Sequence, residues 1–246
     1  QAPNAGWNGF TTISDFYNSF NVSGTAATYG PADTSWDPRL GGRFYKGVTD
    51  VSGIRPGFLV GQQYDQDKKA LKDRKGNPLS YTPTISPTMI ETGSNLEVTG
   101  IRVDKYPPDL TDPTGKYYSS NSGNWEVILR YPDVVLMVAE AMMRQSAADN
   151  AGALTMVNAL RSARGASTLT TMALVNPANV DDPNTLLAER GRELYGEKVR
   201  RTDLIRFGVF NVLWQYKPSD DPKYLVYPVP NQALAANPNL IQNTGY

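Results

Sequence analysis

The sequence predicts a mainly helical fold, in which tetratricopeptide-like helices follow an irregular, loop-rich region with short β-strands. Two observations lead to this fold class. Of the 21 glycines and 18 prolines, 15 and 10 respectively lie in residues 1–125, and this punctuation favours turns and short strands over long helices. Residues 126–246 instead repeat apolar side chains at helical spacing. We therefore expect residues 1–125 to form the candidate ligand-facing part and residues 126–246 a helical part with an extended tail.

Strands and a turn are expected in residues 1–125. The segments 57–64 (GFLVGQQY) and 97–104 (EVTGIRVD) are rich in β-branched and aromatic residues and indicate strands. Residues 69–82 indicate a hairpin or a long turn centred on Gly76 and Asn77, because these two residue types favour turn conformations.

A helical hairpin is expected next. The apolar spacing predicts one helix over Asp133–Gln145 and a second over Gly152–Arg164, with Gly165 placed where a helix C-cap belongs. The apolar stripes consist of Val134, Val138, Ala141 and Met142 in the first helix and of Leu154, Val157 and Leu160 in the second. The two helices together have the length of one tetratricopeptide-like unit of about 33 residues.

A third helix is predicted to begin at Asp182. Asp182 would be the N-cap and Pro183 the first helical residue, and the pattern continues through Arg201. Gly191 and Gly196 each weaken such a helix by about 1 kcal/mol, so we expect a kink or close packing there.

The C-terminal tail is predicted to be extended. Pro228 and Pro230 restrict its backbone, and a short helix is expected from Asn231 until Pro238 stops it.

The composition excludes several function classes. The chain has no His and no Cys, which removes His-based general bases, Ser-His-Asp arrangements, thiolate metal sites, Cys nucleophiles and disulfides. Its 24 Lys and Arg residues balance 24 Asp and Glu residues, whereas nucleic-acid binders normally show a basic footprint. We therefore expect no nucleic-acid partner, and any chemistry would depend on carboxylates, Lys, Tyr or a hard cation.

Three glutamates at four-residue spacing, Glu189, Glu193 and Glu197, are the first candidate site. On one helix face their Cβ atoms would lie about 5–6 Å apart, near the separation of about 5–5.5 Å between the carboxyls of a retaining glycosidase. Glycosidase carboxylates, however, flank the scissile bond from opposite sides. The flanking arginines, which would keep these acids ionised, are Arg190, Arg192, Arg200 and Arg201. We therefore expect a structural network of salt bridges, low in energy where it is exposed.

An acidic turn, Asp65-Gln66-Asp67, is the second candidate. Calcium prefers alternating carboxylates, but the turn lacks the further acids, the central Gly and the closing Glu of a calcium loop, and two lysines follow it. We favour a surface turn and expect no cofactor; a structural calcium ion is the alternative.

Aromatic side chains in the loop-rich part are the third candidate. They are Trp7, Tyr29, Trp36, Tyr45 and Tyr64, with Asn8, Asp33, Arg43 and Gln63 as polar neighbours. Flat rings bind sugars by stacking on their apolar C–H faces, and polar groups fix the orientation. Trp36 is the first choice, because the flanking glycines suggest a loop that presents its side chain outward. The alternative is that these rings anchor irregular loops to the core.

Several ordered motifs resemble one known family. Residues 130–141 read RYPDVVLMVAEA, residues 187–195 read LAERGRELY, and the chain ends in YPVP, NPNL and QNTGY. The front motifs are Gly6–Phe10 and Asp37–Arg39. These motifs resemble those of the SusD/RagB family of nutrient-capture lipoproteins of the Bacteroidetes outer membrane. One departure is that Lys198 stands where the family usually has Gly.

The resemblance implies a non-enzymatic, cell-surface glycan-binding protein with a SusD-like fold. Such a protein captures oligosaccharide and delivers it to a SusC-like TonB-dependent outer-membrane barrel. Family members are about twice as long, so the chain resembles the C-terminal half. The N-terminal half of the same protein would carry the lipid anchor and would be a further partner.

Three alternatives remain at this stage. Some relatives take oligopeptide instead of glycan, and a peptide site would depend more on backbone hydrogen bonds than on exposed rings. A carboxylate glycosidase would use the glutamates described above. A structural subunit would bind no soluble cargo.

Overall fold

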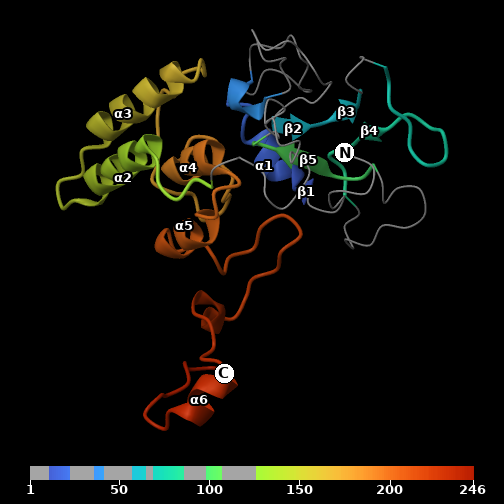
Figure 1. The fold of residues 1–246 in the computed structure, drawn as a ribbon. Helices are drawn as coiled ribbons and strands as arrows, with labels where there is room; N and C mark the ends of the chain where they lie inside the picture. The colour runs from blue at the N-terminus through green and yellow to red at the C-terminus, as the bar shows by residue number, and fades with distance from the viewer. Residues whose placement is uncertain (1–10, 23–35, 42–56, 65–68, 86–97, 107–125) are drawn as a thin grey trace, which may run out of the picture.

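The computed structural model describes residues 11–22, 36–41, 57–64, 69–85, 98–106 and 126–246. In this part the chain is mainly helical with a few short strands, which confirms the predicted fold class. Figure 1 shows the helices of residues 131–206 on one side, the strands on the other, and the C-terminal residues leading away from both. The division at residue 125 stays a prediction.

Three short strands form an antiparallel sheet in the order β1-β5-β2. They are β1 at Thr11–Thr12, β5 at Ile101–Asp104 and β2 at Gly57–Leu59, and the register places Phe58 opposite Val103. The strand predicted over 97–104 is therefore confirmed in its second half.

The strand predicted over 57–64 is interrupted. Gly61 has a φ of 74°, a left-handed conformation that glycine adopts at little cost, and the chain changes sheet there. Gly61–Gln62 form β3, which pairs antiparallel with β4 at Ser80–Tyr81.

The turn predicted around Gly76 is confirmed. Gly76 has a φ of 87°, and the Asp73 carboxylate accepts hydrogen bonds from the backbone N–H groups of Lys75 and Asn77, both at 2.8 Å. A side chain that bonds its own backbone in this way stabilises a tight turn.

An aromatic core joins the sheet to α1, Ser14–Asn18, and to the short 3-10 helix η1, Pro38–Leu40. Its buried members are Tyr17, Phe20, Trp36, Leu40, Phe58 and Ile101. The rings of Phe20 and Phe58 meet edge to face with centroids 5.0 Å apart. Such a pair adds about 0.5–1.5 kcal/mol to the burial of its apolar area. This core fixes η1, and with it Arg39, beside the helical part.

The predicted helical hairpin is confirmed, and each helix begins two residues earlier than expected. The two helices are α2, Tyr131–Arg144, and α3, Asn150–Ala163. Asp149 caps α3 by accepting a hydrogen bond from the backbone N–H of Gly152 at 2.8 Å. Gly165 follows with a φ of 71°, as a C-terminal glycine should.

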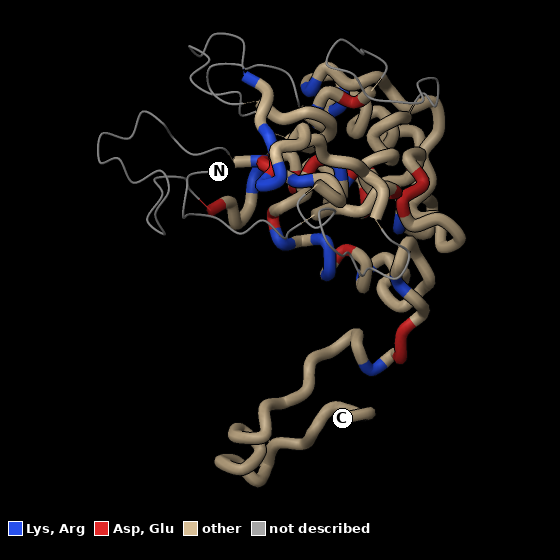
Figure 2. The backbone as a smooth tube through the Cα atoms, turned by 90° about the vertical axis from the view of Figure 1, so that its right-hand side faces the viewer, with Lys and Arg blue, Asp and Glu red and all other residues tan. Residues whose placement is uncertain are grey.

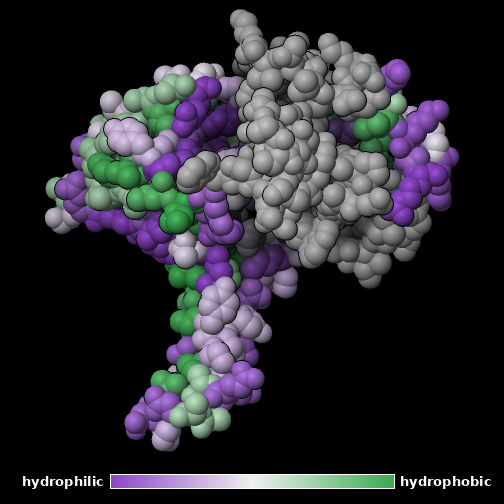
Figure 3. Space-filling model, viewed as in Figure 1, coloured by the Kyte–Doolittle hydropathy of each residue, from purple (hydrophilic) through white to green (hydrophobic). Residues whose placement is uncertain are grey.

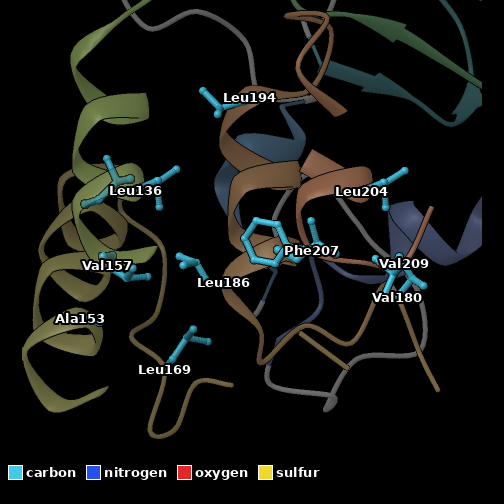
Figure 4. Packing of buried hydrophobic residues seen from close by; sticks show 13 residues of the cluster. Leu136, Ala153, Val157, Leu169, Val180, Leu186, Leu194, Leu204, Phe207 and Val209 are labelled. Atoms are coloured by element: carbon cyan, nitrogen blue, oxygen red, sulfur yellow. The ribbon is translucent and has the colours of Figure 1, made fainter. Parts of the chain in front are cut away.

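The hairpin packs against two further helices, α4, Leu186–Leu194, and α5, Arg200–Arg206. Figure 4 shows Leu136, Val157 and Leu186 in the space between the hairpin and α4. Leu136, Val157 and Leu186 are fully buried there. Burying a side chain of this size contributes about 1.5–3 kcal/mol.

The face of α2 that the core covers shares only Met142 with the predicted stripe. Val134 and Val138 are 38% and 42% exposed, whereas Leu136 is fully buried. The buried face also carries Asp133 and Glu140, which pair with arginines of α4 and α5. Because charged residues occupy core positions, apolar periodicity selects the wrong face. Hydrophobic residues accordingly gather on the surface of the hairpin in Figure 3.

The third predicted helix is two helices. Its N-cap is Thr185, whose hydroxyl accepts a hydrogen bond from Ala188 N–H at 3.1 Å, and not Asp182. The helix breaks after Leu194, where Gly196 has a φ of 75° and Lys198 a φ of 64°. The kink predicted at Gly196 is thus a complete interruption.

Gly191 serves close packing, as predicted. A Cβ atom at this position would lie 3.1 Å from Cε2 of Phe16 and 3.2 Å from Nη1 of Arg200. The absent side chain lets α1 approach α4.

The C-terminal tail folds on itself and touches α5, where Arg201 donates a hydrogen bond to the Tyr224 carbonyl oxygen at 2.7 Å. It contains the 3-10 helix η3, Pro222–Leu225, and the predicted short helix α6, Asn231–Ala236. The Gln242 side chain binds both backbone groups of Val229, at 2.7 and 2.9 Å. Residues 224–246 carry no charged side chain, as Figure 2 shows. Among the described residues, no helix has the length and apolarity that crossing a bilayer requires.

The α2 orientation gives a stability prediction. Leu136→Ala in the full-length protein should lower the free energy of unfolding by about 2–5 kcal/mol, because it leaves a cavity in the core. Val134→Ala should cost about 0.5 kcal/mol or less, because its side chain is exposed. Urea denaturation measures both; a larger loss for Val134→Ala would restore the predicted stripe.

The left-handed Lys198 gives a second prediction. A residue with a side chain destabilises the fold by about 1–2 kcal/mol in this conformation. Glycine removes this strain, but it raises the entropy of the unfolded chain, which offsets about 0.4–1 kcal/mol of the gain. Lys198→Gly should therefore raise the free energy of unfolding by about 0.5–1 kcal/mol. Lys198→Ala removes the same ammonium and keeps Cβ, so an equal gain from it would disprove the backbone explanation.

Candidate functional site

A pocket of about 310 Å³ lies where α4 ends and the two parts of the chain meet. Its lining cations are Arg39, Lys105, Arg130, Arg164 and Arg192. The carboxylates of Glu193 and Glu197 and the side chains of Tyr106, Val127 and Tyr195 complete it. We call this cavity the arginine pocket. Its volume lies at the lower end of the range for small-ligand sites.

Glu193 is the hub of the pocket. Its carboxylate lies 3.1 Å from Arg39, 2.5 Å from Arg130 and 2.7 Å from Arg164. These arginines come from η1, from the residue before α2 and from the end of α3. One buried carboxylate therefore ties three separate segments to α4.

Glu189 lies one turn earlier on α4 and is fully buried. It binds Arg39 at 2.8 Å, Arg161 at 2.6 Å and Arg192 at 2.9 Å. Asp37 completes this inner layer, since its carboxylate lies 2.5 Å from Arg39. The inner layer holds the Arg39 guanidinium in place below the cavity.

Glu197 and Lys105 form the other wall. The Lys105 ammonium pairs with Glu197 and donates to the carbonyl oxygens of Glu193 and Tyr195 at 2.8 and 3.0 Å. It also lies 4.4 Å from the centre of the Tyr195 ring. Arg130 Nε binds Glu197 at 2.8 Å. The last turn of α4 and the residue that follows the helix thus supply the backbone acceptors for Lys105.

The carboxylates of the pocket are held in the ionised form. Burial alone would raise the pKa of Glu193, but hydrogen bonds from Arg164 and Arg130 and the charge of Arg39 outweigh it and lower the pKa to about 2. The same balance of burial against arginine charges holds the pKa of Glu189 far below its usual range. Burial lowers the pKa of Lys105, although Glu197 partly offsets it.

The structural network predicted for the three glutamates is confirmed, with two corrections. The network is buried, and the first correction is that most of its arginines come from segments other than α4. Glu197 lies beyond the end of α4, so the three acids do not share a helix. Among the predicted flanking arginines, Arg192 binds Glu189, while Arg190 pairs with Asp133 and Asp203.

Trp36 does not point outward as predicted. It is 3% exposed, and its ring centre lies 5.2 Å from that of Tyr17 in the aromatic core. Its ring has no free face for a sugar, and the anchoring alternative describes it correctly. Tyr64 is half-buried, and its backbone bridges to Ala70. Neither lines the arginine pocket.

The other predicted ligand residues lie outside the described residues. They are Trp7, Asn8, Tyr29, Arg43 and Tyr45. The Asp65–Asp67 turn also lies outside them, so the calcium alternative stays a prediction. Within the described ranges, no group of three or more Asp or Glu side chains is arranged to hold a metal ion.

Sequence reasoning missed the pocket itself. Arg39 and Arg130 belong to the quoted motifs, but nothing in the sequence showed that both converge on Glu193. Lys105 and Tyr106 follow β5 directly, and a charged residue beside an aromatic one at a strand end is the only sequence signal for them. Tyr106 is 44% exposed, and its hydroxyl is hydrogen-bonded to Glu197.

Comparisons with known proteins agree with one family. The sequence profile of the SusD family matches residues 1–246. A stretch of 70 residues is 40% identical to the starch-binding protein SusD of Bacteroides thetaiotaomicron, covering 25% of this chain and 13% of that protein. A SusD-like protein of Bacteroides fragilis has a similar crystal structure, with a TM-score of 0.57 and 22% identity. That match covers 98% of this chain and 48% of the other, so the chain spans about half the length of its solved relative.

The hub position of Glu193 gives a stability prediction. Glu193→Gln in the full-length protein should lower the free energy of unfolding by about 3–5 kcal/mol, because it removes a buried carboxylate shared by the buried Arg39 and the partly exposed Arg130 and Arg164. Glu126→Gln removes one partner of the exposed pair with Lys198 and should cost about 0.5 kcal/mol or less. Equal losses in urea denaturation would contradict the hub role.

The same variant predicts a pH dependence. The pKa of Glu193 falls from 4.5 to about 2 on folding, so its ionised form stabilises the fold above pH 4.5. This contribution is lost as the pH falls from 4.5 toward 2. The wild-type protein should therefore lose more stability over this interval than Glu193→Gln, which lacks the titrating group.

Proposed function

The chain belongs to the SusD family, as its motifs predicted, and we propose that it captures oligosaccharide at the cell surface. The captured glycan would pass, without cleavage, to a SusC-like TonB-dependent outer-membrane transporter. The N-terminal half of the same protein, with its lipid anchor in the outer membrane, is the second expected partner. We expect no cofactor.

The proposal rests on family membership, and a relative that is named for its ligand supports it. The 70-residue stretch of 40% identity belongs to a protein named for starch binding. SusD family proteins are binding proteins, so capture and not turnover is the expected activity.

The arginine pocket provides the chemistry for capture. Tyr106 lines the pocket and is partly exposed, so the flat face of its ring offers an apolar surface on which a pyranose can stack. Guanidinium N–H groups of Arg130 and Arg164 can donate hydrogen bonds to sugar oxygens. The pocket is preformed, because ion pairs already fix its walls, and a preformed site loses little entropy on binding.

The pocket is poorly suited to glycoside hydrolysis. That reaction needs one protonated carboxylic acid beside an ionised carboxylate. Arginine charges keep the pKa of Glu193 near 2 and also lower that of Glu197. These two residues cannot supply the general acid at neutral pH.

Oligopeptide remains the alternative cargo. A peptide also carries carboxylates and backbone oxygens that arginine side chains can bind. Glycan is preferred, because the exposed ring of Tyr106 suits sugar stacking and a relative is named for starch binding.

Affinity electrophoresis of the full-length protein tests capture. At least one polysaccharide in a broad panel should retard the protein, and no reducing ends should be released. Tyr106→Ala should weaken binding by about 1–3 kcal/mol if the ring stacks on sugar. Tyr224→Ala is the matched control, because Tyr224 has the same 44% exposure but lies in η3. If the protein binds peptides but no polysaccharide retards it, the peptide alternative is favoured. If the wild-type protein releases reducing ends and Glu193→Gln does not, the protein is a glycosidase.

A further inference from the structure

The arginine pocket carries more positive charge than its carboxylates neutralise. Five cationic side chains line it against Glu193 and Glu197. The buried layer behind it adds the cation Arg161 and the anions Glu189 and Asp37. Asp104 adds one more negative charge beside Tyr195 of the lining, so the described residues leave an excess of one positive charge in a partly desolvated site. Such a site attracts an anion strongly, because low-dielectric walls weaken the screening by water.

Two arginines at the mouth keep hydrogen-bond donors for a ligand. Arg164 uses Nε and Nη2 on Glu193, and in the described part of the chain no acceptor binds its Nη1. Arg130 makes one hydrogen bond from each of its three nitrogens, which leaves two of its five N–H groups. Their side chains are 37% and 23% exposed, more than that of Arg39, so these donors are accessible from solvent.

The carboxylates of Glu193 and Glu197 do not occupy the remaining N–H donors of Arg130 and Arg164. Glu193 has four hydrogen bonds to its two carboxylate oxygens from Arg130 and Arg164 alone, and a further one from Arg39. Glu197 accepts from Lys105 and Arg130. These pairs hold the guanidinium planes fixed, and a fixed guanidinium plane matches the two oxygens of a carboxylate.

The remaining lining suits a ring rather than a lone ion. Tyr106 places an exposed aromatic ring beside these donors. A cavity of about 310 Å³ is larger than one carboxylate requires and has room for a sugar residue that carries it. A neutral sugar would use the ring and leave the charge excess uncompensated.

We propose that the arginine pocket binds the carboxylate of a uronic acid residue, so that the captured glycan is acidic. This inference rests on the proposed capture of glycan and adds its chemical class. Arg130 and Arg164 bind the carboxylate, and Tyr106 stacks on the sugar ring that carries it.

Paired polysaccharides test the inference on the full-length protein. Polygalacturonate, alginate and glucuronoxylan would each be cast in affinity gels beside the same polymer with its carboxyl groups methyl-esterified. At least one acidic polymer should retard the protein, and its ester should bind about tenfold more weakly or not at all. Esterification removes the charge and keeps the sugar backbone, so it isolates the carboxylate.

Variants tie this selectivity to the pocket. Arg164→Gln should weaken binding of the acidic polymer about tenfold and weaken binding of its ester much less, because the ester keeps only the hydrogen bonds to sugar oxygens. Arg144→Gln is the control, because Arg144 has a similar side-chain exposure of 39% and pairs with Glu140, which Arg206 also binds. Equal weakening by both variants would indicate nonspecific attraction and overturn the inference.

Arg164→Lys covers the case in which Arg164→Gln does not fold. Lysine keeps the positive charge but lacks the planar pair of N–H donors that a guanidinium offers to a carboxylate. The affinity for the acidic polymer should therefore lie between those of the wild type and Arg164→Gln. Affinity equal to that of the wild type would overturn the role of Arg164.

The outcomes separate this inference from the proposed function. Retardation by neutral polymers or by the esters, as strong as by the acids, would overturn the acidic class and uphold glycan capture. Arg164-dependent binding of oligoglutamate without binding of any uronate polymer would overturn the glycan assignment and point to an acidic peptide. Retardation by no polysaccharide would overturn both.

Discussion

The burial of Glu189 and Glu193 on one turn of α4 is the constraint on which the rest of the described structure depends. Two carboxylates without water must be matched by cations, and the chain brings those cations from the η1 segment, from the start of α2 and from the end of α3. Each arginine can reach these two glutamates only if its own segment is placed correctly. The aromatic core therefore matters for the helices, because it positions Arg39, and the helical hairpin matters for the strands. The strand-containing part and the helical part differ in secondary structure, but these ion pairs make the stability of each depend on the other.

The same constraint gives the pocket properties that suit the proposed binding of a ligand. Arginines that hold buried glutamates cannot release them, so the carboxylates stay ionised and unreactive. The surplus cations nevertheless face an open cavity, and the ion pairs behind them fix their orientation. Catalysis by carboxylates needs a group whose proton is exchangeable near neutral pH, whereas binding needs fixed donors. The arrangement around Glu193 provides fixed donors, and it holds the Glu193 carboxylate in the ionised form.

Sequence patterns predicted the elements of this fold better than their faces. The hairpin, the glycine that ends α3 and the close packing at Gly191 follow from local spacing and conformation, which the sequence carries directly. The buried face of α2 does not, because Asp133 and Glu140 occupy core positions through pairs with Arg190 and Arg206. The prediction for Trp36 fails for a related reason: flanking glycines indicate a loop but do not show that the Trp36 ring itself packs against Tyr17. The pocket depends on pairs such as Arg39 and Glu193, which are 154 positions apart, and such a convergence leaves no local pattern.

Selectivity for an acidic ligand would follow from this preorganisation more than from the overall charge. The whole chain is electrically neutral at the level of its side chains, so it exerts little long-range attraction on a polyanion. Discrimination must then arise at close range, where Arg130 and Arg164 are partly shielded from water and their orientation is already fixed. Shielded charges are screened weakly by salt, unlike those of an exposed basic patch. A pocket of this kind distinguishes a carboxylate from its ester by contact, and its preference should persist at the ionic strength of a physiological medium.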